Sequence, residues 1–245
     1  MTRLSIESWG AVAPGLDDAA GWRAWASAPE PLRGEARPDV SFLPAMQRRR
    51  CDTLSRMMLA AANACCPEAD RAEALSVFAS RHGSFGTTVQ MLESLARDEP
   101  LSPTKFSHSV HNTQAGLFSI WSGNQQVAQS LASRNETFEQ GFLEAVCLLA
   151  RAGDRPVLFV TGDEALPEPV SHLSEDPDPP YAVALLLRPE AGPGDVVELD
   201  LDARHEPPPA PAWPKAIEFL RWLLTGEATP LVLAAPPGAF VWRRA

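Results

Sequence analysis

Histidine, serine and asparagine side chains gather in one short stretch of the chain, Ser107 to Gly116. A serine hydroxyl beside an imidazole base is the arrangement of a nucleophilic acyl-transfer site, so Ser109 with His111 is one candidate pair. However, no G-x-S-x-G turn surrounds Ser109, and side chains two residues apart do not face one another on a helix. The stretch therefore indicates a polar centre without fixing its chemistry.

Two interpretations of His111 and Asn112 remain open. Asparagine is favoured at the residue that caps a helix, and a helix is predicted over about Thr113 to Trp121. In this first interpretation Asn112 is the cap and His111 is a hydrogen-bonded core residue. In the second, both residues belong to an active centre.

Composition excludes several classes of function. The chain has 245 residues, a formal net charge of −10 and a calculated isoelectric point near 5.0. Nucleic-acid binding needs a basic face, so a nucleic-acid partner is not expected. The N-terminus lacks the apolar region of a secretory signal, and no apolar run approaches the ~18 residues of a membrane span. We therefore expect a cytoplasmic protein.

Cysteines and basic residues give weaker signals. None of Cys51, Cys65, Cys66 and Cys147 has metal-ligand spacing. We expect Cys65 and Cys66 to be reduced at a helix end and Cys147 to lie in the core. The basic run Arg48 to Arg50 is either a solvated helix start or a docking surface for an acidic partner.

Strands and helices alternate along the chain. Strands are predicted over 4–12, 73–79, 127–132, 156–161, 181–187, 196–201, 231–235 and 239–242, and helices over 46–64, 87–97, 113–121, 136–152 and 216–224. Val89, Leu92, Leu95 and Ala96 should face the core, and Ser133 with Glu136 fits a capping box. Proline marks an extended connection over 204–214. The alternation predicts an α/β sheet covered by helices.

Several segments, taken in order, resemble the N-terminal half of a β-ketoacyl synthase, which has the thiolase-like fold. The likeness is closest to short, chain-length-factor-like subunits of aryl polyene and xanthomonadin-type pigment pathways. The segments that carry it are Arg48 to Met57, Val77 to Gly83 (VFASRHG), Leu101 to Gly116 (LSPTKFSHSVHNTQAG) and Gly162 to Glu164. The resemblance implies a half-ketosynthase domain over 1–190. Residues 191–245 are expected to form a strand and helix extension packed on that domain.

The resemblance also implies that the nucleophile is missing. A ketosynthase carries its cysteine where a strand turns into a helix, whose N-terminus favours a thiolate. The matching position here is Asn135, and an amide is not a nucleophile. A shift of one or two residues would bring Ser133 or Thr137 to this position, but no cysteine. The family's paired histidines come from a C-terminal half that we expect this chain to lack, and neither His172 nor His205 lies in a glycine-flanked turn.

The resemblance therefore implies a non-catalytic subunit that pairs with an active β-ketoacyl synthase as a heterodimer. It assigns an interface to Val127, Gln129 and Leu131, a pocket wall to Phe106, Phe118 and Trp121, acyl-carrier-protein docking to Arg48, Arg49 and Arg50, and an active-centre scaffold to His111 and Asn112. No metal or cofactor is expected; a phosphopantetheine-bound acyl chain would arrive on the carrier protein. The alternatives are an acyltransferase or thioester hydrolase using His111 with Ser109 or Ser107, and a homodimer that binds carrier proteins without chemistry.

Overall fold

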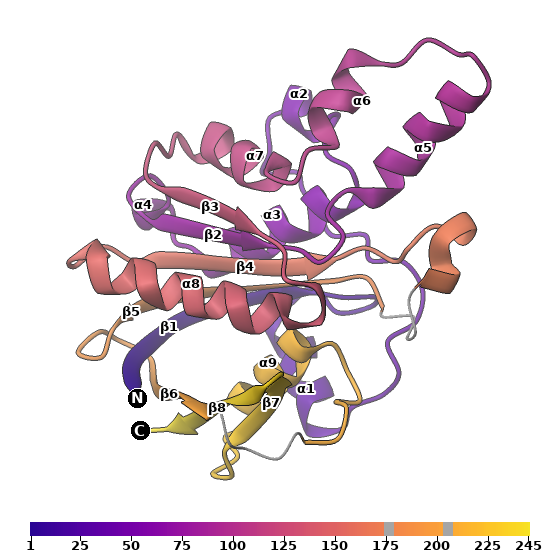
Figure 1. Ribbon diagram of the computed structural model, residues 1–245. Helices are drawn as coiled ribbons and strands as arrows, with labels where there is room; N and C mark the ends of the chain where they lie inside the picture. The colour runs from indigo at the N-terminus through magenta and orange to yellow at the C-terminus, as the bar shows by residue number, and fades with distance from the viewer. Residues whose placement is uncertain (174–178, 203–207) are drawn as a thin grey trace.

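One mixed sheet runs through the computed structural model, which describes residues 1–173, 179–202 and 208–245 (Figure 1). Its strands lie in the order β3-β2-β4-β5-β1-β6-β8-β7. They are β1 (Thr2–Val12), β2 (Leu75–Ala79), β3 (Ala128–Leu131), β4 (Val157–Asp163), β5 (Tyr181–Pro189), β6 (Asp195–Asp202), β7 (Leu231–Ala235) and β8 (Gly238–Arg244). β2 pairs in parallel with β3 and β4, and the other pairs are antiparallel.

Helices cover both faces of this sheet (Figure 1). They are α1 (Ala19–Ser27), α2 (Ala45–Arg48), α3 (Thr53–Cys65), α4 (Glu68–Arg71), α5 (Phe85–Ala96), α6 (Pro103–His108), α7 (Thr113–Ser122), α8 (Thr137–Ala152) and α9 (Lys215–Thr225), with short 3-10 helices η1 (Arg134–Glu136) and η2 (Glu168–Leu173). The predicted α/β architecture, with a mixed sheet covered by helices, is confirmed.

Alternating side chains in the central strands supply two separate cores. In β4, Val157 and Phe159 face the core under α8 and α9, whereas Leu158 and Val160 face the core under α3 and α7. Strand side chains alternate between faces, so these continuous apolar runs are the pattern of strands buried on both sides. Gly141 lets α8 lie close to the sheet, because a Cβ there would be 2.7 Å from the Phe159 ring.

An aromatic cluster fixes α8 against the C-terminal part of the chain. The rings of Phe138 and Phe142 both lie 5.4 Å from Phe219 of α9, centroid to centroid, and within 6 Å of Trp242 of β8. One charged pair crosses the same contact: the fully buried Glu139 of α8 lies 2.5 Å from the Lys215 ammonium of α9. These contacts join the helix after β3 to the C-terminal elements.

The residues after 190 continue the same sheet. β6 pairs with β1, and β8 and β7 follow it to the far edge. Part of the predicted proline-rich connection, residues 203–207 with His205, lies outside the described residues. The division at residue 190 stays a prediction.

Three local predictions are wrong. The helix predicted over 46–64 is two helices, because the Asp52 carboxylate accepts the Ser55 amide hydrogen at 2.8 Å and starts α3. Leu92, Leu95 and Ala96 of α5 do not face the core, since the two leucines are each 58% exposed and Ala96 is exposed as well. Cys147 is also exposed, on the outer side of α8.

The exposure of α5 follows from its position. α5 and α6 extend from the body as a helical hairpin (Figure 1). α5 packs on α6, and its residues Leu92 and Leu95 remain exposed in the part of the chain that the structure describes. Helical spacing predicts an apolar stripe but does not say what packs on it.

Candidate functional site

A polar cluster lies where the parallel strands β2 and β4 end. The Asp163 carboxylate accepts hydrogen bonds from the Ser80 hydroxyl at 2.8 Å and from the His82 amide at 3.0 Å. The Ser80 hydroxyl also accepts the Gly83 amide hydrogen at 2.8 Å. Burial lowers the pKa of His82, so its imidazole is biased toward the neutral form. The cluster holds the turn after β2 in place.

His111 joins this cluster as a donor. Its Nε2 lies 2.9 Å from the Ser80 carbonyl oxygen, which can only accept, so Nε2 carries the hydrogen. Ser107 and Ser109 donate instead to carbonyls of their own helix, those of Thr104 and Phe106, both at 2.9 Å. The described residues contain no hydrogen bond between His111 and either serine, so this geometry does not assemble a nucleophile and base.

The predicted cap at Asn112 is only partly formed. Asn112 precedes α7 and is exposed, but its side chain makes no capping hydrogen bond. Nearby, the buried Gln114 amide donates to the hydroxyls of Ser84 at 3.0 Å and Ser55 at 3.3 Å. Gln114 therefore ties α7 to α3 and to the start of α5, a role that we did not predict from the sequence.

Glu164 extends the cluster to α5. Its Oε1 accepts the Gly86 amide hydrogen at 2.9 Å, at the beginning of α5. Ser84, the residue before α5, makes no side-chain cap, so Glu164 serves this helix start from a distant part of the chain. Burial raises the pKa of Glu164 to about 7, the Gly86 hydrogen bond opposes the rise, and Asp52 and Asp163 add to it.

The turn from β3 into α8 is the position where the sequence predicted a missing nucleophile. Asn135 lies in η1 and is exposed. The residue before it, Arg134, has φ of 49°, in the left-handed region that is unfavourable for arginine. Nucleophiles can occupy strained strand-to-helix turns of this kind. The strained residue here is an arginine, and no thiol is next to it.

A threonine rather than the predicted capping box holds this turn. The Thr137 hydroxyl accepts the Ser133 amide hydrogen at 2.9 Å and donates to the Arg134 carbonyl at 2.8 Å. Ser133 makes no side-chain cap, so the prediction of a box with Glu136 is wrong. The hydroxyl braces Arg134 from both sides, which explains how the strained backbone persists.

β3 forms one edge of the sheet. Val127, just before it, is 51% exposed, Gln129 is exposed, and Leu131 is half-buried. Among the described residues β3 pairs with β2 alone, so its other edge is an open strand edge. The three residues predicted at a partner interface therefore lie along an open strand edge beside the turn.

The other predicted residues are dispersed. Arg49 and Arg50 are exposed after α2, and Arg48 is half-buried. Phe118 is 1% exposed, and its ring centroid lies 5.9 Å from that of Trp121 in the core under α7. Phe106 is 63% exposed on α6, apart from that pair. The proposed pocket wall thus has an inner and an outer part.

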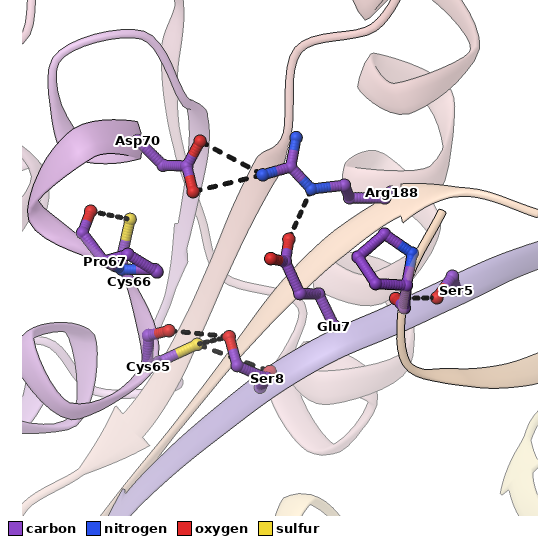
Figure 2. Close-up of polar contacts among 9 residues, drawn as sticks. Ser5, Glu7, Ser8, Cys65, Cys66, Pro67, Asp70 and Arg188 are labelled. Carbon is purple, nitrogen blue, oxygen red and sulfur yellow. Dashed lines mark hydrogen bonds and ion pairs between the residues drawn. The ribbon is translucent and has the colours of Figure 1, made fainter. Parts of the chain in front are cut away.

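The paired cysteines lie at the end of α3, where the Ser8 hydroxyl of β1 donates to the Cys65 carbonyl at 2.6 Å (Figure 2). Arg188 of β5 donates to both oxygens of Asp70 at 3.1 Å and to Glu7 of β1. Burial raises the pKa of Cys65 and raises that of Cys66 to about 12. Both thiols are therefore protonated at neutral pH and poor nucleophiles.

The described part of the chain offers neither a metal site nor a membrane-spanning helix. There, no three His, Cys, Asp or Glu side chains gather closely enough to hold a metal ion. None of the helices in that part is both long and apolar enough to cross a membrane.

Comparison with known proteins identifies the family. The family model of the β-ketoacyl synthase N-terminal domain matches residues 22–243. The chain belongs to this family. The matched range extends past residue 190 and includes the last strands of the sheet. No curated protein sequence matches the chain.

Solved structures agree with this assignment. A chain of the complex of the ketosynthase ApeO with its chain length factor ApeC from Xenorhabdus doucetiae is 30% identical, with a TM-score of 0.81 and 100% of each chain covered. The ishigamide ketosynthase/chain length factor gives 15% identity and a TM-score of 0.75, over 100% of this chain and 99% of that chain. A type II ketosynthase complex with its acyl-carrier protein, AntDE:AntF, gives 12% identity and a TM-score of 0.62, over 77% and 63%. The predicted family and thiolase-like fold are confirmed.

Besides the role of Gln114, the roles of Glu164 and Arg134 were not predicted. Glu164 stood in a recognised motif, but its contact with Gly86 spans 78 residues of sequence. Arg134 gave no signal, because arginine rarely adopts a positive φ. The turn at Arg134 thus keeps a strained backbone that Thr137 holds in place. Its neighbour Asn135 has an amide side chain that cannot attack a thioester.

Proposed function

We propose that this chain is a chain-length-factor-like subunit that pairs with an active β-ketoacyl synthase. Together the two subunits elongate polyene or fatty acyl chains bound to an acyl carrier protein. The observation that carries this proposal is the open edge of β3 beside the turn at Arg134 and Asn135, which keeps its shape without a nucleophile. Support comes also from the relative that is 30% identical over its full length, a chain of a ketosynthase–chain length factor complex.

The distribution of exposed apolar side chains supports a large partner surface. Ten large apolar side chains of the described residues are exposed, and seven of them fall between residues 92 and 127: Leu92, Leu95, Leu101, Phe106, Val110, Ile120 and Val127. They belong to α5, α6, α7 and the segments that connect these helices to one another and to β3. Exposed apolar patches of this kind mark protein–protein contacts. The ketosynthase would cover this face together with the β3 edge.

Chemistry would be divided between the subunits. The ketosynthase would supply the cysteine that holds the growing acyl chain and both histidines of the condensation. This chain would supply pocket walls that limit the length of the product. Phe106 projects outward and would reach the shared pocket directly, whereas Phe118 and Trp121 would support the wall from behind. His111 and Asn112 would keep the scaffold of an active centre.

Delivery of substrate would use the arginine run. Arg49 and Arg50 are exposed cations with no ion pair in the described residues, on a chain of net charge −10. Such a patch favours an acidic carrier protein by electrostatic steering. The only prosthetic group would be the phosphopantetheine of that carrier, and the pathway would operate in the cytoplasm.

Co-purification with the cognate ketosynthase tests the proposal. A tagged ketosynthase should retain this chain in a one-to-one complex through size-exclusion chromatography. Val127→Asp should weaken the complex at least tenfold, because it places a charge on the covered edge. Leu201→Asp is the matched control, since Leu201 is 53% exposed on β6, outside the 92–127 face. A stable monomer or homodimer that ignores the ketosynthase would overturn the proposal.

A further inference from the structure

A cavity of about 510 Å³ opens beside Glu164. Its wall is formed by residues 34–38, by Thr53 and Arg56 of α3, and by Glu164, Ala165 and Pro180. The volume is within the range of about 300–1,000 Å³ that is typical of small-ligand pockets. The wall is distinct from the strained turn and from the β3 edge.

Both hydrogen-bond donors and hydrogen-bond acceptors line this cavity. Glu164 has one hydrogen bond in the described residues, from Gly86 to Oε1, so Oε2 is available to a ligand. Its pKa near 7 lets the carboxyl group either donate or accept at neutral pH. The Arg56 guanidinium donates through Nε and Nη2 to the carbonyls of Cys51 and Arg48, which leaves Nη1 for another acceptor. Such walls suit a ligand that carries amides, each with a donor and an acceptor.

The cavity is continuous with the arginine run. Arg56 holds the backbone of Arg48 at 3.0 Å and that of Cys51 at 3.2 Å. Thr53 follows Arg50 by three residues, so their Cα atoms are at most about 11 Å apart. The wall itself carries both signs of charge, from Arg37 and Arg56 and from Glu35 and Glu164. It therefore suits an uncharged ligand with several hydrogen-bonding groups better than a strongly charged one.

We propose that this cavity receives the pantetheine arm of a carrier protein docked on Arg48, Arg49 and Arg50. The inference rests on the carrier docking in the proposed function and adds a holding site on this subunit. The arm is narrow and uncharged, and its two secondary amides and its hydroxyl match the donors and acceptors of the wall. The phosphate at its root would remain with the arginines. Binding makes and breaks no covalent bond.

Titration of the isotopically labelled full-length chain with free pantetheine, followed by NMR, tests the site. The Gly86 amide signal should shift, because that amide donates to Glu164. Ala165→Trp fills the cavity from an exposed wall position and should weaken binding at least about fivefold, equivalent to the loss of roughly one hydrogen bond. Ala191→Trp, at an exposed turn after β5, is the control and should bind as the wild type does.

Two further measurements keep the result decisive. Thr53→Val removes one hydroxyl without changing side-chain shape and should weaken pantetheine binding. It replaces Ala165→Trp as the test if that variant fails to fold. Co-purification of Ala165→Trp with the ketosynthase should be unchanged, which separates this site from the subunit pairing. No shift at Gly86 at millimolar pantetheine, or equal binding by the wall variants and the control, would overturn the inference.

Discussion

The polar cluster after β2 and β4 differs from the turn after β3 in how many of its side chains are hydrogen-bonded within the chain. In the cluster, Ser80, His111 and Asp163 each find partners within the chain. In the turn, Arg134 and Asn135 are exposed, and their side chains have no hydrogen bond in the described residues. Both regions come from segments that resemble a ketosynthase active centre, yet only the first is complete by itself.

The difference separates the residues of this region that contribute to folding from those that would act only with a partner. The cluster fixes backbone turns, so its residues contribute to folding whether or not a reaction occurs. In the turn, by contrast, the Thr137 hydroxyl holds the backbone in a strained shape, and the side chains of Arg134 and Asn135 remain exposed. A strained and braced turn on an open sheet edge is consistent with a site that a partner completes.

The largest loss of stability is expected at the buried ion pair of α8, the helix that follows the turn. Lys215→Met should lower the free energy of unfolding by about 3–5 kcal/mol, because it leaves the fully buried Glu139 carboxylate without its counter-charge. Burial already raises the pKa of Glu139, and Lys215 opposes that rise. Urea denaturation measures the loss. The double variant Glu139→Leu with Lys215→Met should recover most of it; a single variant as stable as the wild type would contradict this account.

Asp163→Ala compares the two regions directly. It removes the acceptor for the Ser80 hydroxyl and the His82 amide and should cost about 3 kcal/mol. Asn135→Ala, in the turn, should change stability by less than about 0.5 kcal/mol. Equal costs at the two positions would remove the distinction between the regions.

The pH dependence of stability tests the cluster through Glu164. Its pKa is raised to about 7, so the stability linked to its neutral form is present below about pH 4.5 and is lost as the pH rises through 7. The rise of the pKa from 4.5 to about 7 limits this loss to about 3–4 kcal/mol. Glu164→Gln cannot ionise and should flatten the slope of unfolding free energy between pH 5 and 8. Parallel slopes for the two proteins would show that Glu164 does not titrate in this range.

A smaller effect than at Asp163 or Glu164 is expected at the strained residue. Arg134→Gly should raise stability by about 1 kcal/mol, because glycine adopts a positive φ without steric cost. Ser133 has an ordinary φ of −143°, so Ser133→Gly should instead lower stability by about 0.4–1 kcal/mol. Thermal melts of the pair measure both signs, and two losses would show that the turn is unstrained.

Much of the fold could be predicted because its strongest signals are local. β4 and β5 are continuous apolar runs, and α8 carries a regular apolar stripe, so both types of element were identifiable. The start of α3 also had a local signal, since Asp52 precedes Thr53, but the apolar spacing across the break masked it. The face of α5 could not be predicted, because exposure of Leu92 depends on whether another element covers the hairpin.

The site was less predictable because its contacts are distant or conformational. Asp163 and Ser80 are 83 residues apart, and Glu164 and Gly86 are 78 apart. The motifs placed these residues in recognisable segments without showing which atoms meet. The strain at Arg134 is a backbone property that its residue type argues against. Family resemblance predicted the absence of a thiol at this turn, and geometry alone identified which residue carries the strain.

Reconstitution tests the central claim, that this chain completes a partner and lacks chemistry of its own. Condensation of a carrier-bound acyl chain would be followed by mass spectrometry with the ketosynthase alone, this chain alone, and both together. We expect elongated product only with both subunits, and acylation only on the ketosynthase cysteine. Thioester turnover by this chain alone, or full elongation by the ketosynthase without it, would contradict the account.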